Sequence, residues 1–250
     1  MAVKWLQTGE DSAKLEKQAK EAAELAKEQQ GKMWRFFLKE GEDAKITFVD
    51  GDLSKEGFLL PHRYYEHMVM LNNKWQNFVC PKLTLPNAKD CCPFCEGQDR
   101  ASLVALFTVI DHRSFTGKDG KVYKDSPKLL VAKPMTVEIL NKIAQKRGGL
   151  AGASFDVSRT GKKDAAVGNL FDFTEKLDLA TLKAKYTRKV KDASGKETLE
   201  TYFVPAKYEE EIVFRTGAEL KAMPGMDSAG GPAPASSHSE AADGQYEEHL

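Results

Sequence analysis

The chain has 250 residues, 41% of them hydrophobic, and its 37 basic and 37 acidic residues give it no net charge. This composition excludes wholesale disorder and allows one sizeable domain with tails, or two small domains. The sequence has no run of 18 apolar residues and no apolar signal-peptide core near Met1, so we expect a cytoplasmic protein that does not cross a membrane.

Charge is distributed unevenly along the chain. From Asp227 onward there are five acidic residues and no lysine or arginine, which leaves residues 1–226 with five more basic than acidic residues. A mildly basic body with an acidic end is typical of a protein that binds a polyanion, although ordinary charge scatter gives the same balance.

The first predicted element is a helix over residues 9–30, within an N-terminal segment 1–31. Asp11 or Ser12 can cap this helix, Leu15 and three alanines recur at helical spacing, and Gly31 ends it. The apolar stripe is narrow, which indicates either a solvated helix lying on the body or a helix for self-association or a partner.

Short strands separated by turns follow the helix. We expect strands at residues 34–38, 44–49, 57–60, 66–71, 75–80, 102–111, 128–133, 153–159 and 168–173, and helices at 136–147, from about 179 and at 209–222. This order predicts an α+β, mainly β fold. It would be an OB-fold-like barrel over 32–222 with an inserted metal element at about 62–96 and peripheral helices. Residues 223–250 are expected to be a disordered linker with an acidic tail.

All four cysteines fall between residues 80 and 95. In a reducing compartment such a cluster indicates a metal site rather than disulfides. Cys92-Pro93-Phe94-Cys95 is a C-x2-C turn, which aims two thiolates at one tetrahedral ion. Cys80 supplies a third thiolate at the end of a strand, whereas Cys91 is adjacent to Cys92, and neighbouring residues rarely face one small ion.

A histidine is the expected fourth ligand, with His62, His67 and His112 as candidates. A hairpin with its turn at Asn73-Lys74 would put His67 directly opposite Cys80, on the same side of the two strands. A register that slipped by one residue would send the two side chains to opposite faces.

The predicted site is therefore a closed Cys3His set that binds structural Zn2+: His67, Cys80, Cys92 and Cys95. Such a site leaves no open coordination position for catalysis, and metal binding would contribute folding energy. Cys91 or His62 could replace a predicted ligand, and an incidental C-x2-C pair with a buried Cys80 is the alternative to a metal site.

The spacing His67-x12-Cys80-x11-Cys92-x2-Cys95 resembles the zinc subdomain of the T4-type phage single-stranded-DNA-binding proteins. Weaker similarity extends over about residues 30–220, in the segments 34–38, 107–111, 128–133, 158–161 and 167–168. The resemblance implies an OB-fold with an inserted zinc element that coats single-stranded DNA during replication, recombination and repair, in the cytoplasm of an infected bacterial host. The N-terminal helix mixes lysine and glutamate and departs from the basic arm of that family, so high cooperativity is not implied.

Sequence-independent binding of a single strand needs aromatic rings for the bases and cations for the phosphates. The candidate contact residues, chosen where the two kinds of side chain interleave, are Arg63, Tyr64, Tyr65, Trp75, Arg113, Phe115, Arg159 and Lys162. Aromatic residues inside the apolar strands, such as Phe36 and Phe107, are expected to be core instead.

The acidic tail has two interpretations. Asp243, Glu247 and Glu248 either dock on replication or recombination proteins, competing with DNA for the basic body, or form a solubility tail. The leading alternative function is a zinc-stabilised adaptor that binds proteins and no nucleic acid. An enzyme is less favoured, because the chain has no G-x-S-x-G, Walker or H-E-x-x-H motif. Asp50, Asp52 and Asp111 could be proposed as the carboxylates of a nuclease, but the first two are typical of a turn.

Overall fold

The computed structural model describes residues 32–71, 74–85, 91–116, 120, 122–191 and 197–223, together with 9, 12–14, 16–17 and 20. Within the predicted helix at 9–30, residues 12–14, 16–17 and 20 are helical, and the rest of that prediction lies outside the described residues. The predicted linker and the tail residues Asp243, Glu247 and Glu248 also lie outside them. Among the described residues, no helix is long and apolar enough to cross a membrane.

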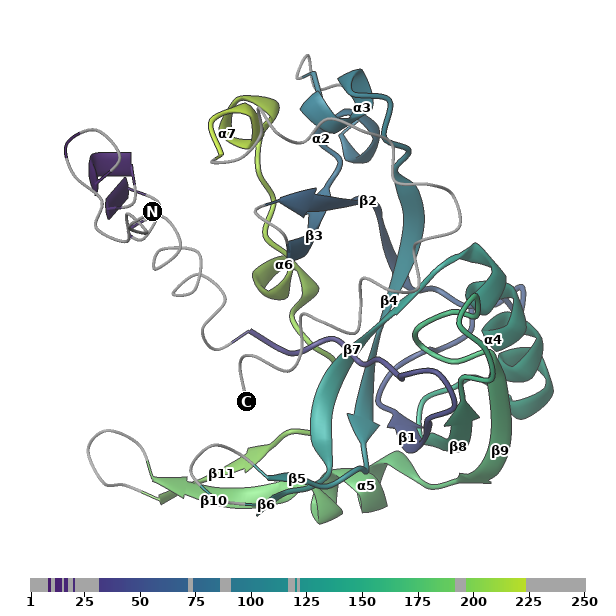
Figure 1. Ribbon diagram of the computed structural model, residues 1–250. Helices are drawn as coiled ribbons and strands as arrows, with labels where there is room; N and C mark the ends of the chain where they lie inside the picture. The colour runs from purple at the N-terminus through teal and green to yellow at the C-terminus, as the bar shows by residue number, and fades with distance from the viewer. Residues whose placement is uncertain are drawn as a thin grey trace.

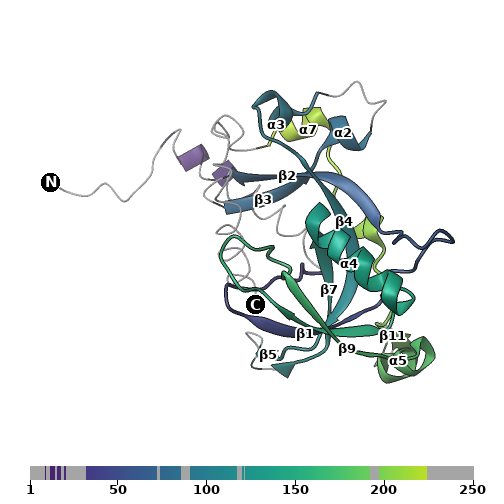
Figure 2. The same ribbon diagram turned by 90° about the vertical axis from the view of Figure 1, so that its right-hand side faces the viewer.

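Seven antiparallel strands form the main sheet (Figures 1 and 2). They are β1 (Asp43–Phe48), β2 (His62–Leu71), β3 (Lys74–Val79), β4 (Ser102–Asp111), β7 (Ser126–Ala132), β8 (Ala153–Ser158) and β9 (Leu170–Lys176). The order is β3-β2-β4-β1-β8-β9, and β7 pairs with β4.

β4 is the centre of the sheet. Ala105 and Leu106 pair with both β2 and β7, so those strands lie on opposite edges of β4, and β1 pairs with its last residues on the edge away from β7. Every β4 side chain from Val104 on is buried. The continuous apolar run at 102–111 therefore predicted this strand with its correct bounds, because a strand covered on both faces loses the polar alternation.

Helices and loops cover both faces of this sheet. On one face, Val137 and Leu140 of α4 (Pro134–Arg147) join Phe107 in the main core. On the other face, Tyr208 of α6 (Tyr208–Glu211) packs against Leu106. α4 begins at a proline and ends at Gly148, which adopts φ 67°, a left-handed conformation that glycine tolerates.

The remaining helices are short. They are α2 (Pro81–Thr84), α3 (Pro93–Glu96), α5 (Leu179–Lys185) and α7 (Gly217–Lys221). The helix predicted at 209–222 is thus two pieces, α6 and α7, and the second starts at a capping box between Thr216 and Glu219.

The fold class α+β, mainly β, is confirmed, but the described pairings form an open sheet, whose order ends at β3 and β9. Two of the predicted strands are not strands. Residues 34–38 run along the outer edge of β7 with a single parallel bridge from Arg35 to Leu129, and 57–60 make one bridge, from Leu59 to Leu53.

Two small hairpins were not predicted. β5 (Phe115–Thr116) pairs with β6 (Val122–Tyr123), and β10 (Thr187–Lys191) pairs with β11 (Glu197–Thr201). Both lie at the end of the molecule opposite α2, α3 and α7, as Figures 1 and 2 show.

A partly buried carboxylate joins β4 to α6. Asp50 accepts a hydrogen bond from the Thr108 amide (3.0 Å) and another from the Tyr208 hydroxyl. Burial raises the pKa of Asp50 from 3.8 to about 6, although both hydrogen bonds oppose the shift. A folded-state pKa above the unfolded value means that this group favours the folded state most below pH 4, and that its contribution is lost as pH rises through 6.

We expect Asp50→Asn to remove this pH dependence, because the amide carries no charge. Its oxygen can accept from the Thr108 amide, and its NH2 group can donate to the Tyr208 hydroxyl, which can in turn donate to Thr108 Oγ1. The wild type should lose up to about 3 kcal/mol of unfolding free energy relative to the variant between pH 4 and pH 7.5. Urea denaturation of the two proteins at a series of pH values measures the difference, and parallel curves would contradict the assigned pKa.

Candidate metal centre and aromatic groove

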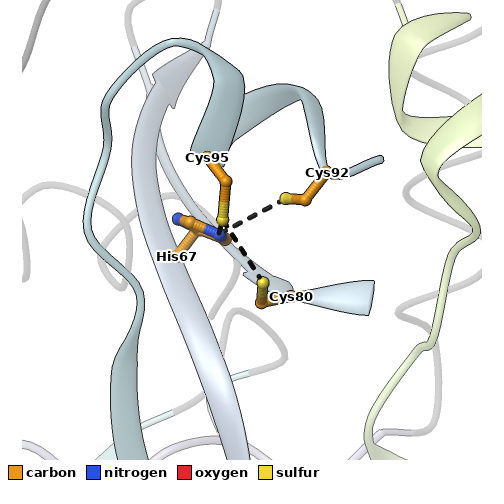
Figure 3. A group of neighbouring side chains, drawn as sticks. All are labelled: His67, Cys80, Cys92 and Cys95. Atoms are coloured by element: carbon orange, nitrogen blue, oxygen red, sulfur yellow. Dashed lines mark hydrogen bonds between the residues drawn. The ribbon is translucent and has the colours of Figure 1, made fainter. Parts of the chain in front are cut away.

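Four side chains converge beside β2 and β3 (Figure 3). The ligand atoms of His67, Cys80, Cys92 and Cys95 all lie within 4.8 Å of one another. His67, Cys80 and Cys92 are fully buried, and Cys95 is partly buried. The His67 Nε2 atom is 3.4 Å from the Sγ atoms of both Cys92 and Cys95, and the Sγ atoms of Cys80 and Cys95 are 3.6 Å apart. This geometry and burial are consistent with a metal site made of the predicted ligands.

The local sequence fixes the positions of Cys80, Cys92 and Cys95. Cys80 and Cys92 are both followed by proline, and each is the N-cap of a one-turn helix, α2 and α3 respectively. Proline is favoured at the first position of a helix because its missing N–H has no partner there anyway. Cys95 lies in α3, so the single helical turn brings its thiol back over that of Cys92.

The hairpin register that we predicted is wrong by two residues. His67 pairs with Phe78, and Cys80 is bonded to Tyr65 through its amide (2.7 Å). Side chains alternate with a period of two, so Phe78 and Cys80 lie on the same face, and a shift of two residues keeps His67 and Cys80 on one side. His67 and Cys80 therefore still lie on the same face, as predicted. A shift by an odd number of residues would have separated them.

Asp99 orients the imidazole. Its Oδ2 atom is 2.6 Å from His67 Nδ1, so Nδ1–H donates to the carboxylate and Nε2 faces the three thiols. Gln98, with φ 66°, turns the chain back after α3 to bring Asp99 there. A carboxylate behind a ligating histidine is a usual partner that fixes the tautomer and raises the basicity of the ligand.

Burial among neighbouring thiols raises the pKa of Cys95 to about 12. A metal ion that binds such thiols must displace their protons. Its positive charge would then compensate the negative thiolates in this pocket.

We expect Asp99→Asn to bind metal about 10 to 100 times more weakly than the wild type, because the amide retains an acceptor but loses the charge behind His67. Competition with a chromophoric chelator measures the affinity. Glu96→Gln is a suitable control, since Glu96 is an exposed carboxylate at the end of α3, three residues before Asp99. Equal affinities of Asp99→Asn and the wild type would contradict this role.

The two alternative ligands lie elsewhere. Cys91 is exposed, and its neighbour in space is Glu96. His62 is exposed at the start of β2, with its ring 4.9 Å from that of Tyr208. His112 is bonded to Asp125 through Nδ1 (2.5 Å) and to Thr47 through Nε2 (2.7 Å).

Asp125, His112 and Thr47 follow one another in the order of the acid, base and nucleophile of a hydrolase triad, but they resemble such a triad in that order only. Thr47 is 2% exposed and bonded to Ser154 (2.7 Å), so no substrate can reach its hydroxyl. The array instead ties the loop that ends at Asp125 to β1 and β8.

Three of the predicted DNA-contact residues have structural roles, and those predictions are corrected. Tyr64 is 8% exposed, and its hydroxyl is bonded to Glu66 (2.5 Å). Arg159 is 1% exposed and donates to the Leu38 carbonyl (2.8 Å). Neither can stack on a base or meet a phosphate.

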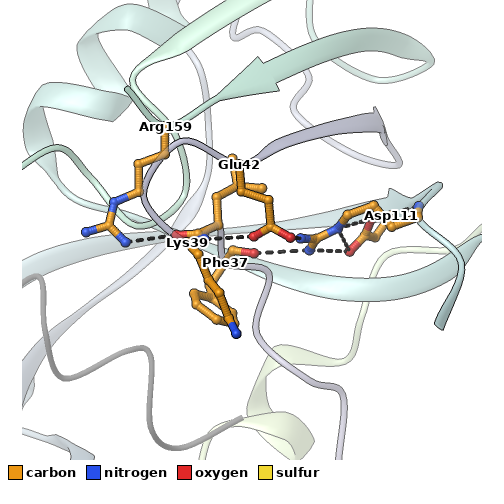
Figure 4. Close-up of polar contacts among 7 residues, drawn as sticks. Phe37, Lys39, Glu42, Asp111 and Arg159 are labelled. Atoms are coloured by element: carbon orange, nitrogen blue, oxygen red, sulfur yellow. Dashed lines mark hydrogen bonds and ion pairs between the residues drawn. The ribbon is translucent and has the colours of Figure 1, made fainter. Parts of the chain in front are cut away.

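Arg113 belongs to a network that fastens the segment before β1 to the end of β4. Its partners Phe37, Glu42 and Asp111 are labelled in Figure 4. Its guanidinium donates to Asp111 (2.8 Å), to Glu42 (2.9 Å) and to the Phe37 carbonyl (3.0 Å). All three partners face this cation, so its donors are already committed within the fold.

The other predicted contact residues are not buried. Arg63 and Lys162 are exposed, and Tyr65, Trp75 and Phe115 are partly exposed. Tyr65 packs partly against the metal element, and Trp75 lies opposite Met70 at the tip of the β2–β3 hairpin.

Phe115 lies in a groove that the sequence did not delineate. We call it the aromatic groove, and its lining residues are Lys32, Met33, Trp34, Phe115, Ser126, Pro127, Lys128 and Glu211. The Phe115 ring is stacked on Tyr123, with centroids 5.1 Å apart and an interplanar angle of 14°, and the Lys128 ammonium is 5.4 Å from its centroid. Trp34 is 41% exposed.

Trp34, Tyr123 and Lys128 were not among the predicted contacts. The sequence predicted Trp34 and Lys128 in two separate strands and gave no sign that either lies near Phe115. They come together only because residues 34–36 run beside β7. The amide of Phe36 donates to the Leu129 carbonyl (2.7 Å), which sets this edge of the groove.

No family model, curated protein or solved structure matches this chain.

Proposed function

We propose that this protein binds single-stranded DNA without strong sequence preference, that the aromatic groove holds bases and phosphates, and that a structural Zn2+ ion fastens the element at 62–96. The observation that carries the proposal is the Phe115–Tyr123 stack with Lys128 above its face, beside the exposed Trp34. Stacked rings accept any base, and adjacent cations accept the backbone, which is the combination that sequence-independent binders use.

Zinc is the metal that the donor set favours. Three thiolates and one imidazole suit tetrahedral Zn2+, whose bonds of about 2.3 Å to sulfur and about 2.0 Å to nitrogen imply ligand separations of about 3.5–3.8 Å. Three of the separations in the structure, 3.4, 3.4 and 3.6 Å, are close to that size, and all the ligand atoms lie within 4.8 Å of one another. His67, Cys80, Cys92 and Cys95 would fill the coordination sphere, so the ion would hold the fold together and leave the binding surface to other residues.

The T4-type phage resemblance supports the same function. In this proposal the open antiparallel sheet would take the role that the closed barrel has in an OB-fold. The strand-binding surface would be the aromatic groove along the outer edge of β7. In that role the protein would coat single strands during replication, recombination and repair, and the acidic tail would bind partner proteins.

Titration with oligo-dT at several salt concentrations tests the proposal, with tryptophan fluorescence as the signal and a duplex of equal length as the control. We expect quenching by the single strand, because Trp34 lines the groove, and an affinity that falls steeply with salt. An absence of binding, or an affinity independent of salt, would reject the proposal and leave a protein-binding adaptor as the better alternative.

A further inference from the structure

A second basic surface lies next to the aromatic groove. Residues 179–191, which span α5 and β10, contain five basic and no acidic residues. The side chains of Lys183, Lys185, Arg188 and Lys189 are exposed. We call these four residues the basic ridge.

The basic ridge is fixed to the core rather than carried on a free arm. Tyr186, in its middle, is 1% exposed and packs with Val49 and Ile110. Its ring lies 5.0 Å from the Lys185 ammonium, and the Arg188 guanidinium lies 5.4 Å from the ring of Tyr202. Two of the cations are thus held over aromatic faces, which reduces the entropy that they lose when they meet an anion.

The charge of the ridge is only partly compensated. In β10, Arg188 lies directly opposite Glu200 of β11, whereas Lys183 and Lys185 belong to α5 and lie outside this strand pairing. Lys189 pairs with Glu197 at 3.6 Å, and both side chains are more than half exposed. Such a surface pair is worth at most about 1 kcal/mol, so a phosphate can displace it readily.

The ridge and the aromatic groove lie at the same end of the molecule. Tyr186, in the middle of the ridge, packs with Ile110 of β4, and Ile110 pairs with Pro127 of β7, which lines the groove. Figures 1 and 2 show the β10–β11 and β5–β6 hairpins at this end, away from the metal element.

We propose that the basic ridge is a second phosphate-binding surface, and that a single DNA strand that stacks in the aromatic groove continues over α5 and β10. This inference rests on the proposed function and assigns it a longer footprint. The ridge exposes cations but few aromatic rings. It would therefore bind the phosphates of the DNA backbone, while the bases would stack in the aromatic groove.

The test compares two triple variants with equal loss of charge. K183Q/K185Q/R188Q neutralises the ridge, and K55Q/K142Q/K146Q neutralises three exposed lysines on and beside α4, where the 53–60 loop is bonded to the helix through Asn141. Each protein is titrated with oligonucleotides of about 4 and about 16 nucleotides at several salt concentrations.

For the longer oligonucleotide, the ridge variant should lose about 2 in the slope of log affinity against log salt, since about three phosphate contacts disappear at about 0.7 each. Its binding of the shorter oligonucleotide should match the wild type, and K55Q/K142Q/K146Q should match the wild type with both. The charge-preserving K183R/K185R/R188K should keep the slope, which separates loss of charge from loss of fold.

A ridge variant with the wild-type slope for the longer oligonucleotide would overturn the inference while leaving the proposed function intact. An equal loss in K55Q/K142Q/K146Q would also overturn it, because net charge alone would then explain the effect. A wild type that binds neither oligonucleotide would reject the proposed function itself, and the ridge proposal with it.

Discussion

Cys92→Ser should abolish stoichiometric metal binding and lower the melting temperature by about 10 °C or more. Cys92 is fully buried, and its thiol faces His67 at 3.4 Å, so a serine hydroxyl there removes one of four ligands and leaves the other thiols without the cation. If metal is present at about 1,000 times its dissociation constant, its loss costs about 4 kcal/mol, which corresponds to roughly 10 °C for a chain of this size.

The damage should be concentrated near the site. Phe94 is 3% exposed, with its ring 5.2 Å from that of Phe78, and Leu220 of α7 packs in the same cluster. Without the metal, α3 and α7 lose the anchor that holds them on the β2–β3 hairpin. We therefore expect faster proteolysis of residues 80–100 and of the chain after Lys221, with the main sheet retained.

Elemental analysis, thermal melting and limited proteolysis measure these effects. Cys91→Ser is the matched control, because Cys91 is the adjacent residue of the same type and is exposed. It should keep one metal per chain and the wild-type melting temperature. Metal loss in Cys91→Ser, or full metal content in Cys92→Ser, would show that the ligand set is wrong.

The four converging side chains of the candidate metal site could be predicted from the sequence because thiol spacing reports local geometry. A C-x2-C turn needs only one helical turn to converge, and the Cys-Pro steps at Cys80 and Cys92 start two such turns. Predicting the histidine required the pairing of two strands. The prediction held although the register was wrong, because a shift by an even number of residues leaves each side chain on the same face of the sheet.

The DNA-contact predictions were weaker, because composition does not report burial. Arg159 lies in a polar stretch that is typical of a surface loop, yet it is 1% exposed and bonded to the Leu38 carbonyl. The aromatic groove could not be delineated either, since it needs residues 32–34 to run beside β7. The β10–β11 hairpin escaped prediction because its strands are mostly polar and show no apolar alternation.

Barrel closure is a third property that the strand pattern could not determine. Alternation, apolar runs and turns predicted β1, β4, β7 and β8, but whether the ends of a sheet meet depends on its coiling and on the stagger between strands. Those quantities are set by side-chain packing across the whole sheet, and the described pairings here leave it open.

Phe115→Ala should weaken binding of single-stranded DNA by about 5- to 150-fold, because one stacked base contributes about 1–3 kcal/mol. The substitution removes the ring that stacks on Tyr123 and faces Lys128, while the small β5–β6 hairpin keeps its two backbone pairings. No charge changes, so the dependence of affinity on salt should stay as in the wild type.

The companion Lys128→Gln variant should behave in the opposite way, with a salt slope reduced by about 0.7 for one lost phosphate contact. Phe58→Ala is the matched aromatic control, because Phe58 is 57% exposed and lies in the loop that packs on α4. It should bind as the wild type does. Equal losses in Phe115→Ala and Phe58→Ala would indicate a general effect of aromatic removal. Unchanged affinity in Phe115→Ala alone would move the base-stacking surface away from the aromatic groove, toward Trp75 at the tip of the β2–β3 hairpin.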